Sequence, residues 1–139
     1  MKEILYFEEE KWFAETLMKN VRKHQHWNVT HVHTPAAFFQ RINSNIQYEL
    51  FILDIMAPME IFTEADLDAL FDAQQRRLND GLNVGVVFYE IIREKDAYKE
   101  TPVIFYTSKS NPGIMEEKVR YISKPADVQS IINIINELL

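Results

Sequence analysis

The 139-residue sequence contains no cysteine and no long apolar run. Without cysteine there is no disulfide framework, no thiolate nucleophile and no Cys-ligated zinc. The longest apolar runs, such as Leu50–Leu53, are far shorter than the roughly 20 residues that a membrane span needs. No basic segment precedes an apolar one at the N-terminus, as a secretory signal would require. We therefore expect a cytoplasmic protein that does not bind membranes.

Glycine and positive charge are also scarce. The only glycines are Gly81, Gly85 and Gly113, and 15 Lys and Arg stand against 21 Asp and Glu, for a net charge of −6. A net acidic chain without a basic stripe is unsuited to nucleic acid. Nucleotide and flavin sites need a turn rich in Gly, Ser or Thr after the first strand to hold phosphate. Here that turn is Glu8-Glu9-Glu10, which would repel phosphate, so an enzyme of that kind is disfavoured.

Short apolar runs alternate with stretches of helical periodicity. The pattern predicts an α/β fold of the flavodoxin-like, doubly wound kind, with five parallel strands in the order 2-1-3-4-5. The predicted strands span residues 4–7, 27–33, 49–54, 101–107 and 119–122, and the predicted helices span residues 11–24, 35–43, 84–95, 112–118 and 127–138.

The segment from Ile55 to Glu100 is longer than one crossover helix requires, since such a helix and two loops need only about 25 residues. Thr63 resembles an N-cap, and Leu67, Leu70 and Phe71 begin an apolar stripe. We expect an extra helix inserted after the third strand, at about residues 59–80. It either covers the site described next or packs as a decoration on the surface.

Polar residues stand where the predicted strands end, and ligands of open parallel sheets bind at that edge. The first strand ends in Glu8-Glu9, the third in Asp54, the fourth in Thr107 and the fifth in Lys124. Three carboxylates that close together are costly unless a cation lies among them. Oxygen ligands without His or Cys suit Mg²⁺, with Mn²⁺ as the alternative. A carboxylate nucleophile, a divalent cation, a hydroxyl and an ammonium form a set suited to phosphoryl transfer.

Four blocks in this order resemble the receiver domain of response regulators. They are ILYFEEE from Ile4, LFILDIMAP from Leu50, TPVIFYTSKS from Thr101 and YISKP from Tyr121. The resemblance covers the whole chain apart from the insertion, so residues 1–139 are interpreted as a single receiver domain. It implies that Asp54 accepts a phosphoryl group from a sensor histidine kinase or a phosphotransfer protein.

The resemblance also assigns roles to the neighbouring residues. Glu8, Glu9, Asp54 and the backbone carbonyl of Met56 would bind Mg²⁺. Thr107 would hydrogen-bond the phosphoryl group, Lys124 would pair with it, and Thr107 and Tyr121 would form the switch that changes the surface offered to a downstream protein effector. Such a domain is a signalling module, at most catalysing its own phosphotransfer and dephosphorylation, and we expect it to stand alone because the sequence ends one helix after Lys124.

The sequence departs from the receiver pattern at several places. Glu9 stands where Asp is usual, and the extra methylene matters because Mg²⁺ demands near-octahedral geometry. Glu8-Glu9-Glu10 could instead be a solvated run before a helix, and the whole chain could be a pseudo-receiver that works without phosphate. Only about two helical turns fit between Thr107 and Lys124.

Two further features leave alternatives open. Ile134 and Leu139, outside the stripe of the last helix, fit either a homodimer or a buried helix. His31 and His33 alternate onto one face of the second strand, which favours an exposed edge strand over a metal site.

Overall fold

A five-stranded parallel sheet forms the centre of the molecule, with its strands in the order β2-β1-β3-β4-β5. The computed structural model describes residues 1–24, 26–56, 63–64 and 84–139. The strands are β1 (Lys2–Phe7), β2 (Trp27–Val32), β3 (Leu50–Leu53), β4 (Val103–Thr107) and β5 (Val119–Ser123). Both the fold class and the strand order predicted from the sequence are confirmed.

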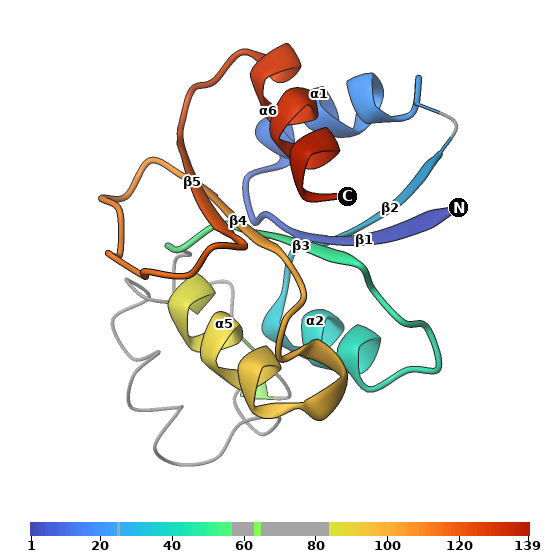
Figure 1. The fold of residues 1–139 in the computed structure, drawn as a ribbon, viewed down its shortest axis with the longest axis vertical. Coiled ribbons are helices and arrows are strands. Elements are labelled where there is room, and N and C mark those ends of the chain that lie inside the picture. The colour runs from blue at the N-terminus through green and yellow to red at the C-terminus, as the bar shows by residue number, and fades with distance from the viewer. Residues whose placement is uncertain (25, 57–62, 65–83) are drawn as a thin grey trace.

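Helices cover both faces of this sheet, α1 (Lys11–Val21) and α6 (Val128–Leu138) on one face and α2 (Pro35–Ile42) and α5 (Val84–Glu94) on the other (Figure 1). The short 3-10 helix η2 (Asp96–Tyr98) follows α5. Because residues of a strand alternate between the two faces, the buried side chains divide into two clusters. One contains Phe7, Phe38 and Phe88, and the other contains Tyr6, Leu17 and Ile131.

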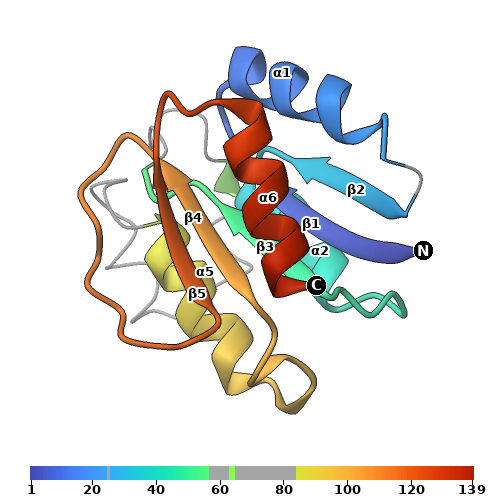
Figure 2. The same ribbon diagram turned by 45° about the horizontal axis from the view of Figure 1, so that its top comes forward.

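The central strands are buried along almost their whole length. Every residue of β3 and of β4 is buried, as the continuous apolar runs predict for strands covered on both faces. The edge strands differ, since most residues of β2 and β5 are partly buried or exposed. Turning the molecule shows the strands fanned with the usual twist and α6 lying across the sheet (Figure 2).

Local sequence accounts for the starts of α2 and α6. Thr34 accepts a hydrogen bond from the backbone N–H of Ala37 at 3.2 Å and Pro35 opens α2, an N-cap followed by proline in the first turn. Asp127 caps α6 in the same way through the N–H of Gln129. None of the described helices is both long and apolar enough to cross a membrane.

One predicted element is wrong: no helix forms in the connection between β4 and β5, where residues 112–118 were expected to supply about two turns. Gly113, the second residue of the predicted helix, has φ of +75°, outside the right-handed helical region. The side chain of Asn111 accepts a hydrogen bond from the N–H of Gly113 at 2.8 Å, which stabilises a turn instead. The predicted insertion at about residues 59–80 lies outside the described residues, apart from Thr63 and Glu64.

Candidate functional site

The carboxyl ends of β1 and β3 place two carboxylates side by side. Phe7 pairs with Leu53 in the register of the sheet, and Glu8 and Asp54 are the residues that follow. The backbone N–H of Asp54 donates to the carbonyl of Phe7 at 3.1 Å, which fixes this arrangement. Within the described residues, the buried polar or charged residues are Glu8, Asp54 and Thr107. All three were singled out from the sequence as site residues.

Lys124 joins the two carboxylates. Its Nζ lies 2.5 Å from Oε1 of Glu8 and 3.0 Å from Oδ2 of Asp54, and its side chain is only 4% exposed. The backbone brings it there, because its N–H donates to the carbonyl of Thr107 at 2.9 Å as β5 ends beside β4. The ammonium also lies over two aromatic rings, 4.4 Å from the centroid of Phe13 and 5.4 Å from that of Tyr106.

Burial sets the protonation of this cluster. Loss of solvent, followed by repulsion from Asp54, raises the pKa of Glu8 to about 8 despite the attraction of Lys124. Burial alone would lower the pKa of Lys124, but Asp54 and Glu8 outweigh it and raise that pKa above its usual value. The lysine therefore stays charged at neutral pH, where Glu8 is largely protonated, and its ammonium contacts the side chains of both Glu8 and Asp54.

Further contacts, which were not predicted from the sequence, hold Glu8 in place. The hydroxyl of Tyr6 donates to Oε1 of Glu8 at 3.3 Å, and the N–H of Glu10 donates to Oε2 at 3.2 Å. Nε2 of His31 lies 2.7 Å from the backbone carbonyl of Glu8, to which it can donate. Tyr6 could have been found, because it stands two residues before Glu8 and so shares its face of the strand. His31 could not, since only the sheet register brings it to Glu8.

The predicted switch residues lie at the opposite side of the site. The Thr107 hydroxyl accepts a hydrogen bond from the N–H of Lys109 at 3.0 Å. The hydroxyl of Tyr121 donates to the backbone carbonyl of Lys109 at 2.6 Å. Lys109 is therefore hydrogen-bonded at both of its backbone groups, and its backbone links the hydroxyl of Thr107 to the hydroxyl of Tyr121.

The two remaining predicted ligands are less closely held. Glu9 is partly exposed, with its pKa raised by partial burial, by Glu10 and by Asp54, and Met56 is 42% exposed. In the part of the chain that the structure describes, no three His, Asp or Glu side chains are arranged to hold a metal ion. The oxygen donors suit Mg²⁺ chemically, but Glu8 and Asp54 here converge on the ammonium of Lys124.

Comparison with known proteins identifies the fold. No protein-family model matches the sequence, and no curated protein shows significant sequence similarity. Solved structures do match over nearly the full length. A receiver domain of two-component signalling from Clostridium thermocellum has a TM-score of 0.66 at 19% identity, covering 99% of this chain and 97% of that one. The chemotaxis protein CheY4 of Vibrio cholerae has a TM-score of 0.70 at 14% identity, covering 100% and 99%.

A third similar structure is the response regulator TrrA of Thermotoga maritima, which was crystallised with Mg²⁺ and BeF. Its TM-score is 0.65 at 20% identity, and the two chains cover each other completely. TrrA has also been solved in complex with the histidine kinase ThkA. The chain therefore has the fold of response-regulator receiver domains, as expected from its four sequence blocks.

Proposed function

We propose that this protein is a receiver that accepts a phosphoryl group on Asp54 and signals through protein–protein interaction. The observation that carries the proposal is the buried cluster of Glu8, Asp54 and Thr107 around Lys124, at the strand ends of a receiver fold. The full length, residues 1–139, is proposed as one such domain. The proposed donor is a phosphohistidine of a sensor kinase or a phosphotransfer protein, as the complex of TrrA with ThkA suggests.

Asp54 is the better nucleophile of the two carboxylates. Its side chain is 10% exposed, whereas that of Glu8 is fully buried, so only Asp54 can be reached by an incoming phosphoryl group. A carboxylate oxygen of Asp54 attacks the phosphorus, and the P–N bond of phosphohistidine breaks with its electron pair passing to the imidazole. Lys124 then pairs with a phosphoryl oxygen, and the hydroxyl of Thr107 donates to another. Lys124 already contacts Asp54 at 3.0 Å, which would lower the cost of organising the transferred charge.

Glu8, Glu9, Asp54 and the carbonyl of Met56 would hold Mg²⁺, once Lys124 releases Glu8 and the side chain of Glu9 turns inward. The ion would offset the negative charge of the phosphoryl group and the carboxylates. Tyr121 and the connection between β4 and β5 would change on phosphorylation and so present a new surface to a downstream effector.

A second candidate is a pseudo-receiver that binds partners without phosphate. It is favoured by the hydrogen bonds that already occupy both carboxylate oxygens of Glu8. Such a protein would keep the fold and its surfaces while Lys124 serves as a permanent structural cation.

Acetyl phosphate with Mg²⁺ separates the two candidates. Intact-protein mass spectrometry should show one added phosphoryl group on the wild type and none on Asp54→Asn, which keeps the shape of the side chain but cannot form the acyl phosphate. Calorimetry with beryllofluoride and Mg²⁺ should show binding to the wild type only. If neither reagent acts on the wild type, or if Asp54→Asn still becomes labelled, phosphorylation at Asp54 is excluded.

A further inference from the structure

Tyr6 lies beside the proposed phosphoacceptor site and is completely buried, with 0% of its surface exposed. A buried phenol ring packs well, but its hydroxyl is removed from water and is stabilised by a polar partner. That partner is Glu8, whose Oε1 accepts a hydrogen bond from the hydroxyl at 3.3 Å. Phenylalanine would fill the same space without this bond, so packing of the strand alone does not account for the hydroxyl.

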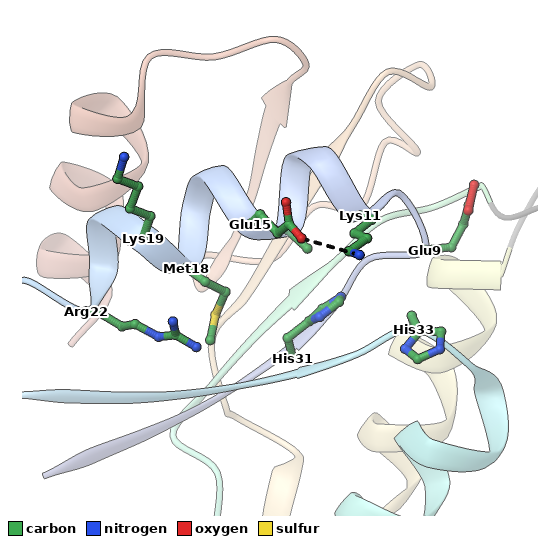
Figure 3. A pocket seen from close by; sticks show the side chains of 9 residues that line it. Glu9, Lys11, Glu15, Met18, Lys19, Arg22, His31 and His33 are labelled. Carbon is green, nitrogen blue, oxygen red and sulfur yellow. Dashed lines mark ion pairs between the residues drawn. The ribbon is translucent and has the colours of Figure 1, made fainter.

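The neighbouring strand restrains the ring of Tyr6. Tyr6 pairs with His31 in the register between β1 and β2, and the two ring centroids lie 5.5 Å apart. His31 projects from β2 toward α1, on the same face of the sheet as Tyr6 (Figure 3). Nε2 of His31 lies 2.7 Å from the backbone carbonyl of Glu8. Tyr6 and His31 therefore contact the side chain and the backbone of the same acidic residue.

The groups that contact the carboxyl of Glu8 differ in what phosphoryl transfer requires of them. The ammonium of Lys124, 2.5 Å from Oε1, must leave Glu8 to pair with a phosphoryl oxygen. The hydroxyl of Tyr6 on Oε1 and the N–H of Glu10 on Oε2, at 3.2 Å, have no such second role. Both contacts can therefore remain when Lys124 departs.

A glutamate that binds a metal ion benefits from such a contact. Its side chain has one more rotatable bond than that of aspartate, so fixing it costs more conformational entropy. Mg²⁺ demands a near-octahedral arrangement of oxygen ligands, and the oxygens of Glu8, Glu9 and Asp54 suit it chemically. Hydrogen bonds from neighbouring side chains commonly orient metal-binding carboxylates, and losing one typically lowers metal affinity by about 10–100-fold.

We propose that Tyr6 is a positioning residue of the phosphoacceptor site, whose hydroxyl holds the carboxylate of Glu8 in place while Lys124 gives way to Mg²⁺. The inference rests on the proposed function, because it concerns the metal that would assist transfer to Asp54. Tyr6 acts through Glu8 and not on the phosphoryl group itself.

Tyr6→Phe removes the hydroxyl and keeps the ring. The matched control is Tyr48→Phe, which removes the hydroxyl of a tyrosine that is 1% exposed and belongs to the cluster on the other face of the sheet. Calorimetric titration with Mg²⁺ alone should show binding about 10-fold weaker for Tyr6→Phe than for the wild type, and unchanged for Tyr48→Phe. Urea unfolding confirms that both variants are folded under the conditions of the titration.

Phosphorylation by acetyl phosphate separates positioning from a general structural role. Tyr6→Phe should need about 10-fold more Mg²⁺ for half of its maximal rate, whereas the rate at saturating Mg²⁺ should not change. Equal Mg²⁺ affinity of Tyr6→Phe and the wild type overturns the inference, and so do equal losses in the two variants or a wild type that binds no Mg²⁺ at tens of millimolar. A wild type that binds Mg²⁺ but takes up no phosphoryl group overturns the proposed function instead, so the two failures are distinguishable.

Discussion

Lys124 is the charged residue that links the buried acidic side chains of the site. Its ammonium compensates the carboxylate of Asp54 and contacts Glu8, and both of these side chains are almost completely removed from water. The rings of Phe13 and Tyr106 lie against the same ammonium. A buried ion pair adds little stability compared with apolar residues, but removing only one member leaves an uncompensated charge.

Lys124→Met should therefore lower the free energy of unfolding at pH 7 by about 3–5 kcal/mol. The control Lys99→Met removes a lysine whose pair with Asp96 is exposed, and it should cost at most about 1 kcal/mol. Urea unfolding of both variants measures the difference. Equal losses of unfolding free energy in the two variants would show that the buried carboxylate of Asp54 does not need the ammonium of Lys124.

Glu8 gives the stability of the protein a specific pH dependence. Because burial raises its folded pKa to about 8, the folded state holds a proton that the unfolded state releases near pH 4.5. The contribution of this group is complete below pH 4.5 and is lost as the pH rises through 8. Glu8→Gln removes the titration while keeping the shape of the side chain.

We expect the stability of the wild type, relative to Glu8→Gln, to fall by on the order of 1 kcal/mol or more between pH 5 and pH 8. Urea unfolding of both proteins at pH 5, 6.5 and 8 measures this difference, from which the titrating groups that do not interact with Glu8 cancel. A difference that rises with pH instead would mean that Lys124 keeps Glu8 ionised throughout.

At the scale of elements, α5 approaches the end of β3 too closely for any side chain at Gly85. A Cβ added there would lie 2.2 Å from the backbone oxygen of Asp54, and the N–H of Gly85 donates to the carbonyl of Ile55 at 2.9 Å. The contact is with backbone on both sides, so neither partner can rotate away.

Gly85→Ala should destabilise the protein by about 1–3 kcal/mol, as overpacking usually does. Helix propensity alone predicts the opposite sign, since alanine is better than glycine by about 1 kcal/mol within a helix. The sign of the change in urea unfolding therefore decides between the two effects. A gain in stability would show that α5 can move away from β3 at no cost.

The connection between β4 and β5 is held by side chains in place of a helix. Arg93 of α5 donates to Glu116 through Nε at 3.1 Å and Nη2 at 2.9 Å, and Tyr89 donates to the other oxygen at 2.5 Å. Burial acts to raise the pKa of Glu116, but the hydrogen bonds from Tyr89 and Arg93 outweigh it and hold the pKa below its usual value.

Glu116→Gln should cost about 1 kcal/mol, since the pair is partly exposed, and should speed amide exchange across residues 108–118. Glu117→Gln, which changes the adjacent exposed residue, should affect neither quantity. Hydrogen–deuterium exchange with mass spectrometry measures the connection directly. Unchanged exchange in Glu116→Gln would mean that the turn at Asn111 and Gly113 holds the connection without the charge.

At the scale of the whole molecule, burial differs sharply between the central and the edge strands. All residues of β3 and β4 are buried, whereas β5 has one buried residue, Ile122. Amides in β3 and β4 should exchange only through global unfolding, and those of β2 and β5 through smaller openings. Exchange at low urea concentrations tests this order. Equal protection of β5 and β3 would contradict it.

The sequence predicted the sheet because each strand carries its own signal, a short apolar run that ends in a polar residue. Glu8, Asp54, Thr107 and Lys124 could be found in the same way, since strand ends meet at one edge. The contacts of His31 and Phe13 with the site could not, because they depend on how neighbouring elements pack. The expected helix at residues 112–118 does not form because Gly113 adopts a positive φ and its N–H is bonded to the side chain of Asn111, a local turn that segment length does not reveal.

The two tryptophans have very different surroundings, and this gives the protein two separate optical signals. Trp12 is 64% exposed and lies edge-on to Phe13, four residues beyond Glu8, whereas Trp27 is 9% exposed and stacks on His24 at 4.8 Å. Trp12 should emit at long wavelength and be quenched by iodide, and Trp27 should emit at short wavelength and be protected. Fluorescence can thus follow events near Asp54 and the integrity of β2 in one sample, without any added label.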